Sequence, residues 1–236
     1  MLLRPIGSLM TLFALTTGLG VGVASLPAQA QPVIIDTEDT IVPAESVHTF
    51  EGQAGQTVTI IMESDDFDTV LSLQTATGEE IAFNDDFGGS LNSRIVAEIP
   101  ADGTYRIVAR SYAGNGGNFS LVVRSATDYE VALARAEALN TEERYREAIA
   151  AYTAAIALDP QQAIGYLGRA QATLGQVYLE QGGPIEGPED IPAAARQAVI
   201  ADFETAADLI EAEGNGEWAA GLREQAAFLL EMGAGN

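Results

Sequence analysis

Apolar and polar positions alternate over short stretches in the first half of the chain, and a helical period replaces this alternation near Ser125. In residues 57–63 and 105–110, apolar side chains fall on one face and polar ones on the other, as expected of strands with one buried face. Turn signals rich in Gly, Asn and Asp separate such runs. Strands are predicted at 46–50, 57–63, 69–74, 80–84, 94–99, 103–111 and 118–124, with an earlier short one at 33–36. This spacing favours an antiparallel β-sandwich resembling a jelly roll.

The second half is rich in Ala and follows the helical period, with Thr127 or Asp128 as the first N-cap. Its predicted helices span 129–140, 141–158, 163–179, 193–213 and 217–231. Residues 181–188 are rich in Gly and Pro and are not expected to be helical. The predicted fold class is therefore multidomain α and β. A β-sandwich in 31–125 precedes an all-α array in 126–236, with two hairpins, an insertion at about 181–192 and a capping helix at 217–231.

The N-terminal residues 1–30 have the three parts of a secretory signal. Arg4 is basic, residues 9–23 are apolar and small, and an Ala-x-Ala sequence ends at Ala30. The apolar stretch is shorter than the ~20 residues a membrane span needs, which disfavours the alternative of a retained anchor helix. We therefore expect cleavage after Ala30, a periplasmic or secreted mature chain, and no stable membrane insertion.

The composition narrows the classes of ligand. The chain has 34 acidic and 11 basic residues, a formal charge of −23, and its basic residues are all Arg. Nucleic acid and anionic membrane surfaces are disfavoured as partners by this charge, whereas cations and basic protein surfaces remain open. The absence of Cys excludes disulfides, thiolate metal sites and a Cys nucleophile.

A motif in the helical half has the order of small and large residues seen in stacked hairpins. Residues 145–160 read YREAIAAYTAAIALDP. Ala148 and Ala155 allow helices to approach closely, Tyr152 fills the gap between hairpins, and Pro160 stops the helix. The segment resembles the second helix of a tetratricopeptide repeat. A second repeat resumes at 202–207, after an insertion of roughly 17 residues relative to the 34-residue period.

The tetratricopeptide resemblance implies a concave face that binds a protein or peptide partner. Without Lys, a carboxylate clamp is disfavoured, so we expect the partner segment to be basic or apolar. The implied partner-binding residues are Glu130, Leu133, Glu137, Asn140, Ile164, Leu167 and Gln171.

In the β-rich half, ordered motifs at 65–73, 81–86, 103–107 and 119–123 resemble the bacterial pre-peptidase C-terminal domain over about residues 40–125. This family consists of β-sandwiches on secreted proteins, often attached to proteases without being catalytic, and some members bind calcium or polymeric substrates. The resemblance implies a binding role, and it carries no enzymatic activity to this chain.

Two acidic clusters in this half are the strongest candidates for chemistry. Ca²⁺ takes about six to eight oxygen ligands, preferring carboxylates and amide carbonyls at turns. The candidate ligands are Asp65, Asp66, Asp68, Asn84, Asp85 and Asp86. The alternative is that these side chains shape turns by bonding their own backbone and otherwise face water.

The catalytic signals are weak. His48 is the one histidine, it lies in the predicted strand at 46–50, and no Gly-x-Ser-x-Gly elbow accompanies it. The sequence therefore predicts an exported, non-catalytic binding or scaffolding protein. In this prediction the helical repeats hold a protein partner, and the β-sandwich binds calcium, an extracellular polymer or a partner. The alternatives are an accessory subunit of an exported hydrolase and a hydrolase that uses clustered carboxylates.

Overall fold

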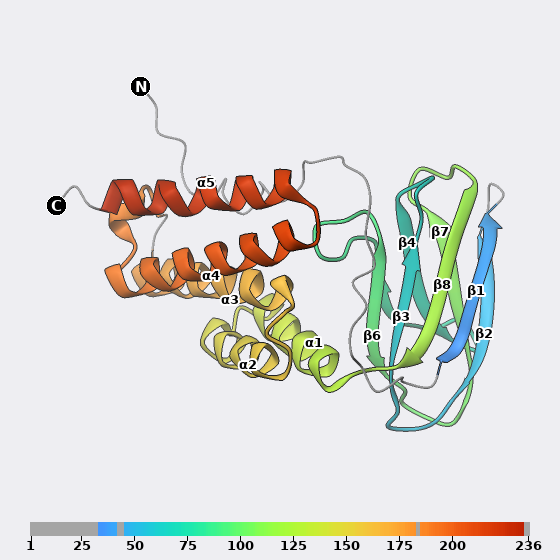
Figure 1. Cartoon of the computed structure of the whole chain (residues 1–236). Helices are drawn as coiled ribbons and strands as arrows, with labels where there is room; N and C mark the ends of the chain where they lie inside the picture. Colours follow the sequence, from blue (N-terminus) through green and yellow to red (C-terminus); the bar gives the residue numbers. More distant parts are fainter. Residues whose placement is uncertain (1–32, 42–44, 183–184, 234–236) are drawn as a thin grey trace. The chain divides into compact units, whose positions relative to one another are not determined.

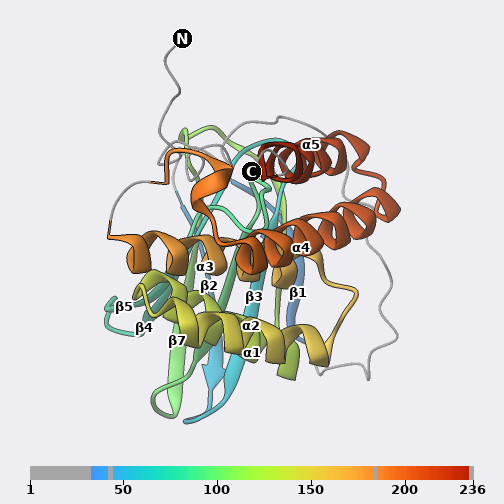
Figure 2. The same cartoon turned by 90° about the vertical axis from the view of Figure 1, so that its left-hand side faces the viewer.

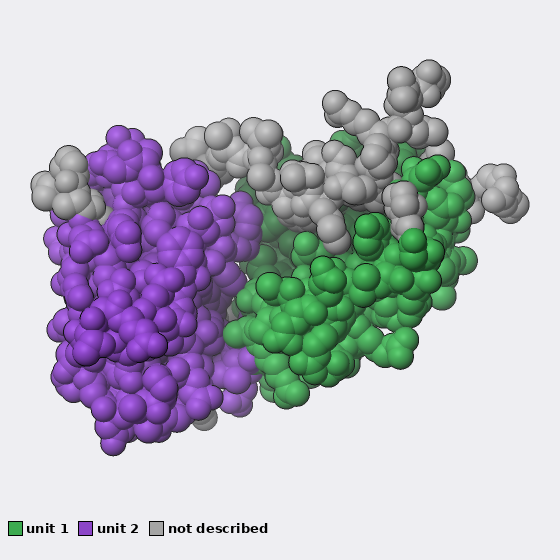
Figure 3. Space-filling model, turned by 180° about the vertical axis from the view of Figure 1, so that it is seen from behind, with its two compact units in different colours: residues 1–25, 132–236 green, residues 26–131 purple. Residues whose placement is uncertain are grey.

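The computed structural model describes residues 33–41, 45–182 and 185–233. The described residues divide into two compact units, one within residues 33–131 and the other within residues 132–233 (Figure 3). The predicted signal peptide and its cleavage site at Ala30 lie outside the described residues.

The first unit is a sandwich of two antiparallel four-stranded sheets. Sheet A has the order β1-β8-β3-β6 and sheet B the order β2-β7-β4-β5 (Figure 1). The strands are β1 (Val33–Ile41), β2 (Ser46–Gly52), β3 (Thr57–Glu63), β4 (Thr69–Thr75), β5 (Glu80–Asn84), β6 (Ser93–Glu98), β7 (Gly103–Ser111) and β8 (Gly117–Ser125). The strand pairs are nested: β1 pairs with β8, β2 with β7, β3 with β6, and β4 with β5 in the central hairpin. This nested pairing is that of a jelly roll, as predicted.

Alternation along the strands builds the core of the sandwich. In β3, Val58, Ile60 and Met62 are fully buried, and they pack with Leu71 of β4 and Leu121 of β8. Every second residue of each strand points between the sheets, so the observed register is the one that buries the apolar set. The predicted sandwich is confirmed, and β1 is longer than the predicted strand at 33–36.

Helices follow the strands. The described residues contain α1 (Asp128–Thr141), α2 (Tyr145–Leu158), α3 (Ala163–Gln181), the 3₁₀ turn η2 (Pro188–Asp190), α4 (Ala193–Ala212) and α5 (Gly216–Gly233). Thr127 is the N-cap of α1, since its Oγ1 accepts the Glu130 N–H at 3.2 Å and its own N–H donates to Glu130 Oε2 at 2.8 Å. This is a reciprocal capping box.

Two predicted helix boundaries are corrected. The second helix was expected to open at residue 141, but α1 continues through Thr141 and α2 begins only at Tyr145. Glu143 takes φ +58°, a left-handed conformation that breaks the helix between them. The third helix was expected to end at residue 179, but α3 continues to Gln181, the first residue of the stretch 181–188 that was expected to lack helix; the 3₁₀ turn η2 begins at Pro188, the last residue of that stretch.

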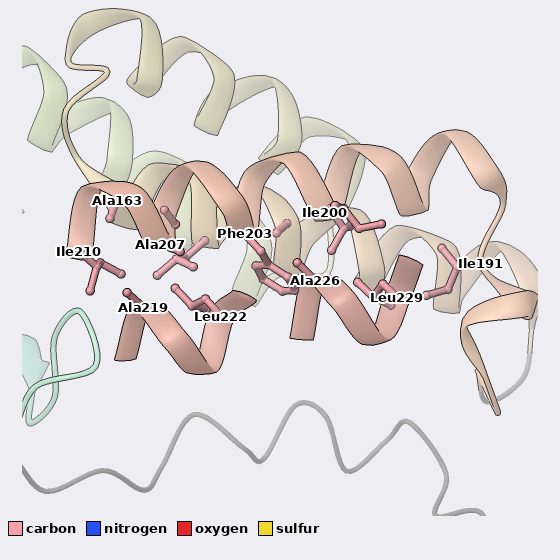
Figure 4. Close-up of a cluster of buried hydrophobic side chains, with 14 of the residues drawn as sticks. Ala163, Ile191, Ile200, Phe203, Ala207, Ile210, Ala219, Leu222, Ala226 and Leu229 are labelled. Atoms are coloured by element: carbon pink, nitrogen blue, oxygen red, sulfur yellow. The ribbon is translucent and has the colours of Figure 1, made fainter. Parts of the chain in front are cut away.

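In the helical unit, α2 packs on α3, α3 on α4, and α4 on α5 (Figure 2). Figure 4 shows Phe203 and Ala207 of α4 facing Leu222 and Ala226 of α5, and Ile191 of the insertion joins the same cluster. Neighbouring helices are thus consecutive in sequence, as in stacked hairpins. The tetratricopeptide identity of these helices stays a prediction.

One ion pair and one close steric contact join neighbouring helices. Arg169 of α3 donates to both carboxylate oxygens of buried Asp202 in α4, at 3.0 and 2.6 Å. Gly168 makes room for the ring of Tyr152, because a Cβ there would come within 2.3 Å of that ring. The ion pair joins α3 to α4, and the absence of a side chain at Gly168 lets Tyr152 of α2 pack against α3.

Among the described helices, none has the length and apolar content that crossing a membrane requires.

Candidate functional site

Three loops of the sandwich meet at one end. They are residues 64–68 between β3 and β4, 85–92 between β5 and β6, and 112–116 between β7 and β8. Antiparallel pairing places them together, because β3, β5 and β7 all end at this side of the sandwich. Backbone hydrogen bonds join them: the Thr69 N–H donates to Leu91 O, and the Tyr112 N–H donates to Asp68 O, both at 2.9 Å. We call these three loops the loop end.

Three carboxylates crowd at the loop end. Burial raises the pKa of Asp68, and the charges of Asp86 and Asp85 raise it further. The pKa of Asp86 is also raised, first by burial and then by Asp85. Asp68 Oδ1 is buried and has no hydrogen-bond partner among the described residues. The structure therefore brings Asp68, Asp85 and Asp86 together as a site that a cation would neutralise.

The other predicted metal ligands, Asp65, Asp66 and Asn84, are exposed or hydrogen-bonded to backbone groups. Asp66 Oδ2 accepts the Asn118 N–H at 2.7 Å, and Asn84 Oδ1 accepts the Arg94 N–H at 2.8 Å. The Asn84 amide donates to Asp86 O at 2.9 Å, while Asp65 is exposed. The bond from Asn84 to Asp86 O is within its own turn, as the alternative interpretation expected, whereas Asp66 bonds the backbone of β8 and Asn84 Oδ1 bonds that of β6. In the described part of the chain, no group of three or more His, Cys, Asp or Glu residues is arranged to hold a metal ion. Calcium binding stays a prediction.

Exposed apolar side chains also lie at the loop end, Leu91 in the loop of Asp85 and Asp86 and Tyr112 in the loop 112–116. Tyr112 is 71% exposed and Leu91 is 57% exposed. Arg94 lies over the Phe87 ring, 4.8 Å from its centroid, and fixes the loop 85–92 on its inner side. Tyr112 and Leu91 were not predicted as site residues. The sequence feature that could have identified them is a large apolar residue among turn-forming residues in each loop.

The seven residues predicted to line a concave helical face do not form one exposed surface. Glu130, Leu133 and Leu167 are buried, with exposures of 2%, 3% and 8%. Glu137, Asn140 and Ile164 are half-buried, and Gln171 is exposed. Leu167 and Ile164 belong to the helical core or pack against it. The repeat alignment predicted that these side chains would be exposed to a partner. Several of them are instead buried against other residues of this chain.

Glu130 shows the physical reason most clearly. Its Oε1 lies 2.6 Å from Arg124 Nη2, and its carboxylate also pairs with Arg94. Thr59 Oγ1 donates to Oε2 at 2.9 Å. The Glu130 side chain is therefore enclosed by residues of β3, β6 and β8, and it is not presented to a partner.

His48 has polar neighbours, but not the geometry of a catalytic triad. Ser46 Oγ lies 3.0 Å from His48 Nε2, and Asp39 Oδ2 lies 3.8 Å from the same nitrogen. In a Ser-His-Asp triad the hydroxyl and the carboxylate occupy opposite ring nitrogens. Here they compete for one nitrogen, so the carboxylate does not orient the ring for attack by Ser46. This contact could have been predicted from the sequence, because residues i and i+2 of one strand, here Ser46 and His48, lie on the same face.

Comparisons with known proteins concern the β-sandwich. No family model matches the sequence, and no curated protein matches it. The solved structures similar to this chain include the pre-peptidase C-terminal domain of collagenase from Bacillus anthracis, with 13% identity and a TM-score of 0.34 over 39% of this chain and 90% of that chain. Another is PliG from Aeromonas hydrophila, a periplasmic inhibitor of g-type lysozyme, with 19% identity and a TM-score of 0.34 over 43% of this chain and 93% of that chain. A third is the Yersinia pseudotuberculosis-derived mitogen, with 17% identity and a TM-score of 0.34 over 42% of this chain and 90% of that chain.

Proposed function

We propose that this chain is an exported, non-catalytic binding protein whose loop end receives a cationic side chain of a protein partner. The observation that supports this proposal is the crowding of Asp68, Asp85 and Asp86, with raised pKa values at Asp68 and Asp86. A Lys or Arg side chain placed beside them relieves their mutual repulsion.

The surroundings of the acidic group suit a protein partner. Exposed Tyr112 and Leu91 offer apolar contact area beside the charge, and aromatic residues are enriched where proteins bind each other. The formal charge of −23 attracts basic partners over a distance and accelerates their encounter. An accessory role beside a separately encoded exported hydrolase is one form of this function.

Capture of exported proteins on the immobilised full chain tests the proposal. The test variant is the triple substitution Asp68→Asn, Asp85→Asn and Asp86→Asn. The matched control is Glu79→Gln, in the turn between β4 and β5 at the opposite end of the sandwich. We expect a basic protein that wild type and the control retain at low salt, and that the triple variant or high salt releases. Equal retention by the triple variant would exclude the loop end as the binding site.

Calcium is a second candidate ligand for the same carboxylates, favoured by the buried and unbonded Asp68 Oδ1. Asp68, Asp85 and Asp86 are not arranged as a metal site in this structure, so the loops would have to bring their carboxylates closer together around the ion. The full chain is stripped with EDTA and its melting midpoint is then followed during Ca²⁺ addition. Calcium binding predicts a rise in the midpoint that the triple variant lacks. A melting midpoint that does not change on Ca²⁺ addition excludes calcium binding. The protein-partner proposal is then tested by the capture experiment alone.

Enzymatic activity is tested separately. Broad hydrolase screening of the full chain should give no turnover. Robust turnover that Asp85→Asn abolishes would overturn the non-catalytic proposal in favour of a carboxylate-based hydrolase.

A further inference from the structure

The helix α5 has two contrasting faces. One face is the buried row Ala219, Leu222, Ala226 and Leu229, which points toward α4 in Figure 4. The opposite face carries residues spaced alternately by four and three positions, the spacing with which one helix contacts another. We call this face the α5 outer strip, and its members are Glu217, Gly221, Glu224, Phe228 and Glu231.

Phe228 is the large apolar residue of this strip. Its side chain is 45% exposed, and it is not part of the helical core cluster. A single exposed apolar residue is ordinary on a protein surface. Phe228 becomes informative because of the residue that lies two turns before it on the same face.

That residue, Gly221, has no packing reason among the residues that the structure describes. A Cβ at Gly221 would meet nothing within 4 Å, whereas at Gly168 and Gly175 it would collide with the rings of Tyr152 and Tyr145. Glycine inside a helix lowers helix stability relative to alanine. At Gly168 and Gly175 that loss is offset by close packing within the chain. At Gly221 the bare backbone leaves space for a side chain that comes from another molecule.

The carboxylates of the strip indicate the charge of that molecule. Glu217, Glu224 and Glu231 are exposed, and the structure shows no hydrogen bond or ion pair for them among its described residues. Arg223, the basic residue of α5, instead pairs with Asp208 and Glu211 of α4. A second copy of the strip would oppose Glu to Glu, so charge complementarity requires a basic partner.

We propose that the α5 outer strip docks an amphipathic helix of a partner protein that carries Lys or Arg beside a large apolar residue. The apolar side chain packs over Gly221 and against Phe228, and the basic side chains reach the three glutamates. This is a helix-on-helix recognition mode, with anchors at helical spacing. The docking surface includes no residue of the loop end, so its test is independent of the test of the proposed function.

The probe for this surface is a synthetic helical peptide made of Leu and Lys in seven-residue repeats, with Leu on one face. Binding to the full chain is measured by fluorescence anisotropy of the labelled peptide. Two comparison peptides are used: one has the same composition in scrambled order, and the other has Glu in place of Lys. We expect wild type to bind the amphipathic basic peptide at least about tenfold more tightly than either comparison peptide.

Variants of the strip locate the binding. Phe228→Ala and Gly221→Leu should each weaken binding about tenfold, the first by removing the anchor and the second by filling the space. Replacing Glu217, Glu224 and Glu231 by Gln should weaken binding and reduce its dependence on salt. The matched controls are Leu158→Ala on α2 and Glu204→Gln on α4, both exposed positions outside α5, and they should bind as wild type does. Circular dichroism confirms that each variant is folded.

Equal affinity of wild type and Phe228→Ala, or equal binding of the scrambled peptide, would overturn the proposal. Self-association of the full chain that Phe228→Ala abolishes would also overturn it, because the occupant would then be a second copy.

Discussion

Arg124, near the end of β8, and Glu130, in the first turn of α1, face each other in a two-point ion pair. Arg124 Nη1 lies 2.7 Å from Glu130 Oε2, and Arg124 Nη2 lies 2.6 Å from Oε1. The compact unit that contains the sandwich accordingly runs to Val131, beyond the boundary predicted at residue 125. The β-sandwich therefore includes the start of α1 as a structural part.

Glu130→Gln should destabilise the sandwich by about 3 kcal/mol, because it leaves two largely buried guanidinium groups without their carboxylate. Arg94 and Arg124 expose only 17% and 21% of their side chains. Hydrogen exchange of the β3 and β8 amides measures the free energy of opening this sheet. Glu147→Gln, which removes an exposed pair with Arg144, should leave that exchange unchanged. A loss at Glu130→Gln of less than about 1 kcal/mol would show that the buried pair contributes little.

Asp202→Asn should cost the helical unit about 2 to 3 kcal/mol, because it removes the charge from a bidentate pair with Arg169 at a position that is 4% exposed. The hydrogen bond and charge of Asp202 raise the pKa of Arg169 in the folded chain, so breaking the pair removes part of the attraction between α3 and α4. Urea denaturation followed by Trp218 fluorescence reports on this unit, since Trp218 packs against its core. Asp208→Asn, at an exposed pair, is the control and should leave the midpoint unchanged.

The helix glycines should respond oppositely to alanine. Gly168→Ala places a Cβ within 2.3 Å of the Tyr152 ring and should cost about 1 to 3 kcal/mol through overpacking. Gly221→Ala meets nothing within 4 Å and should stabilise the helix by about 0.5 to 1 kcal/mol. The same Trp218 denaturation curves compare the two. If both substitutions destabilised the chain, Gly221 would have a structural role of its own.

Asp86→Asn should stabilise the sandwich at neutral pH by a few tenths of a kcal/mol, a small effect because the side chain is exposed and screened. Burial and Asp85 raise the pKa of Asp86 above its ordinary value of 3.8, so the folded state binds this proton more tightly than the unfolded state. The free energy of unfolding therefore falls as pH rises from 3.8 through the raised pKa of Asp86, because the carboxyl group loses its proton in the folded state. It rises again on acidification. Melting midpoints should therefore favour Asp86→Asn at neutral pH and coincide with wild type near about pH 3. A gain that persisted at low pH would require a cause other than charge.

Alternation along the sequence was enough to predict most of the sandwich. The predicted bounds 57–63, 80–84 and 103–111 coincide with β3, β5 and β7, because a buried and a solvated face force a period of two on each strand. The break between α1 and α2 was misplaced, since Glu143 adopts its left-handed conformation without the Gly or Asn that usually signals one. The local pattern around residues 141–144 favours helix, but the Arg144 N–H donates to Leu139 O and closes the end of α1 in an exposed turn.

The candidate site could be predicted only in part. The Asp clusters were identified, but not which members meet, because that depends on how the three loops fold over the end of the sandwich. Asp68 and Asp86 come together through the hairpin β4-β5, in which Leu71 pairs with Asn84. The burial of Glu130 had no local signal at all. Its partners Arg94 and Arg124 lie in the β-rich half, and their convergence is a property of the completed sheet.

Pairing of the first strand with the last also dictates the order of folding. Along β1, Ile41 pairs with Gly117 and Val33 with Arg124, so the N-terminal strand finds its neighbour only after most of the domain has been synthesised. Contacts between residues so distant in sequence close slowly, because a long loop must be ordered before any pairing stabilises it. During synthesis β1 must wait with its backbone groups unpaired until β8 has left the ribosome. The sandwich therefore cannot be completed before residues 117–125 have been made.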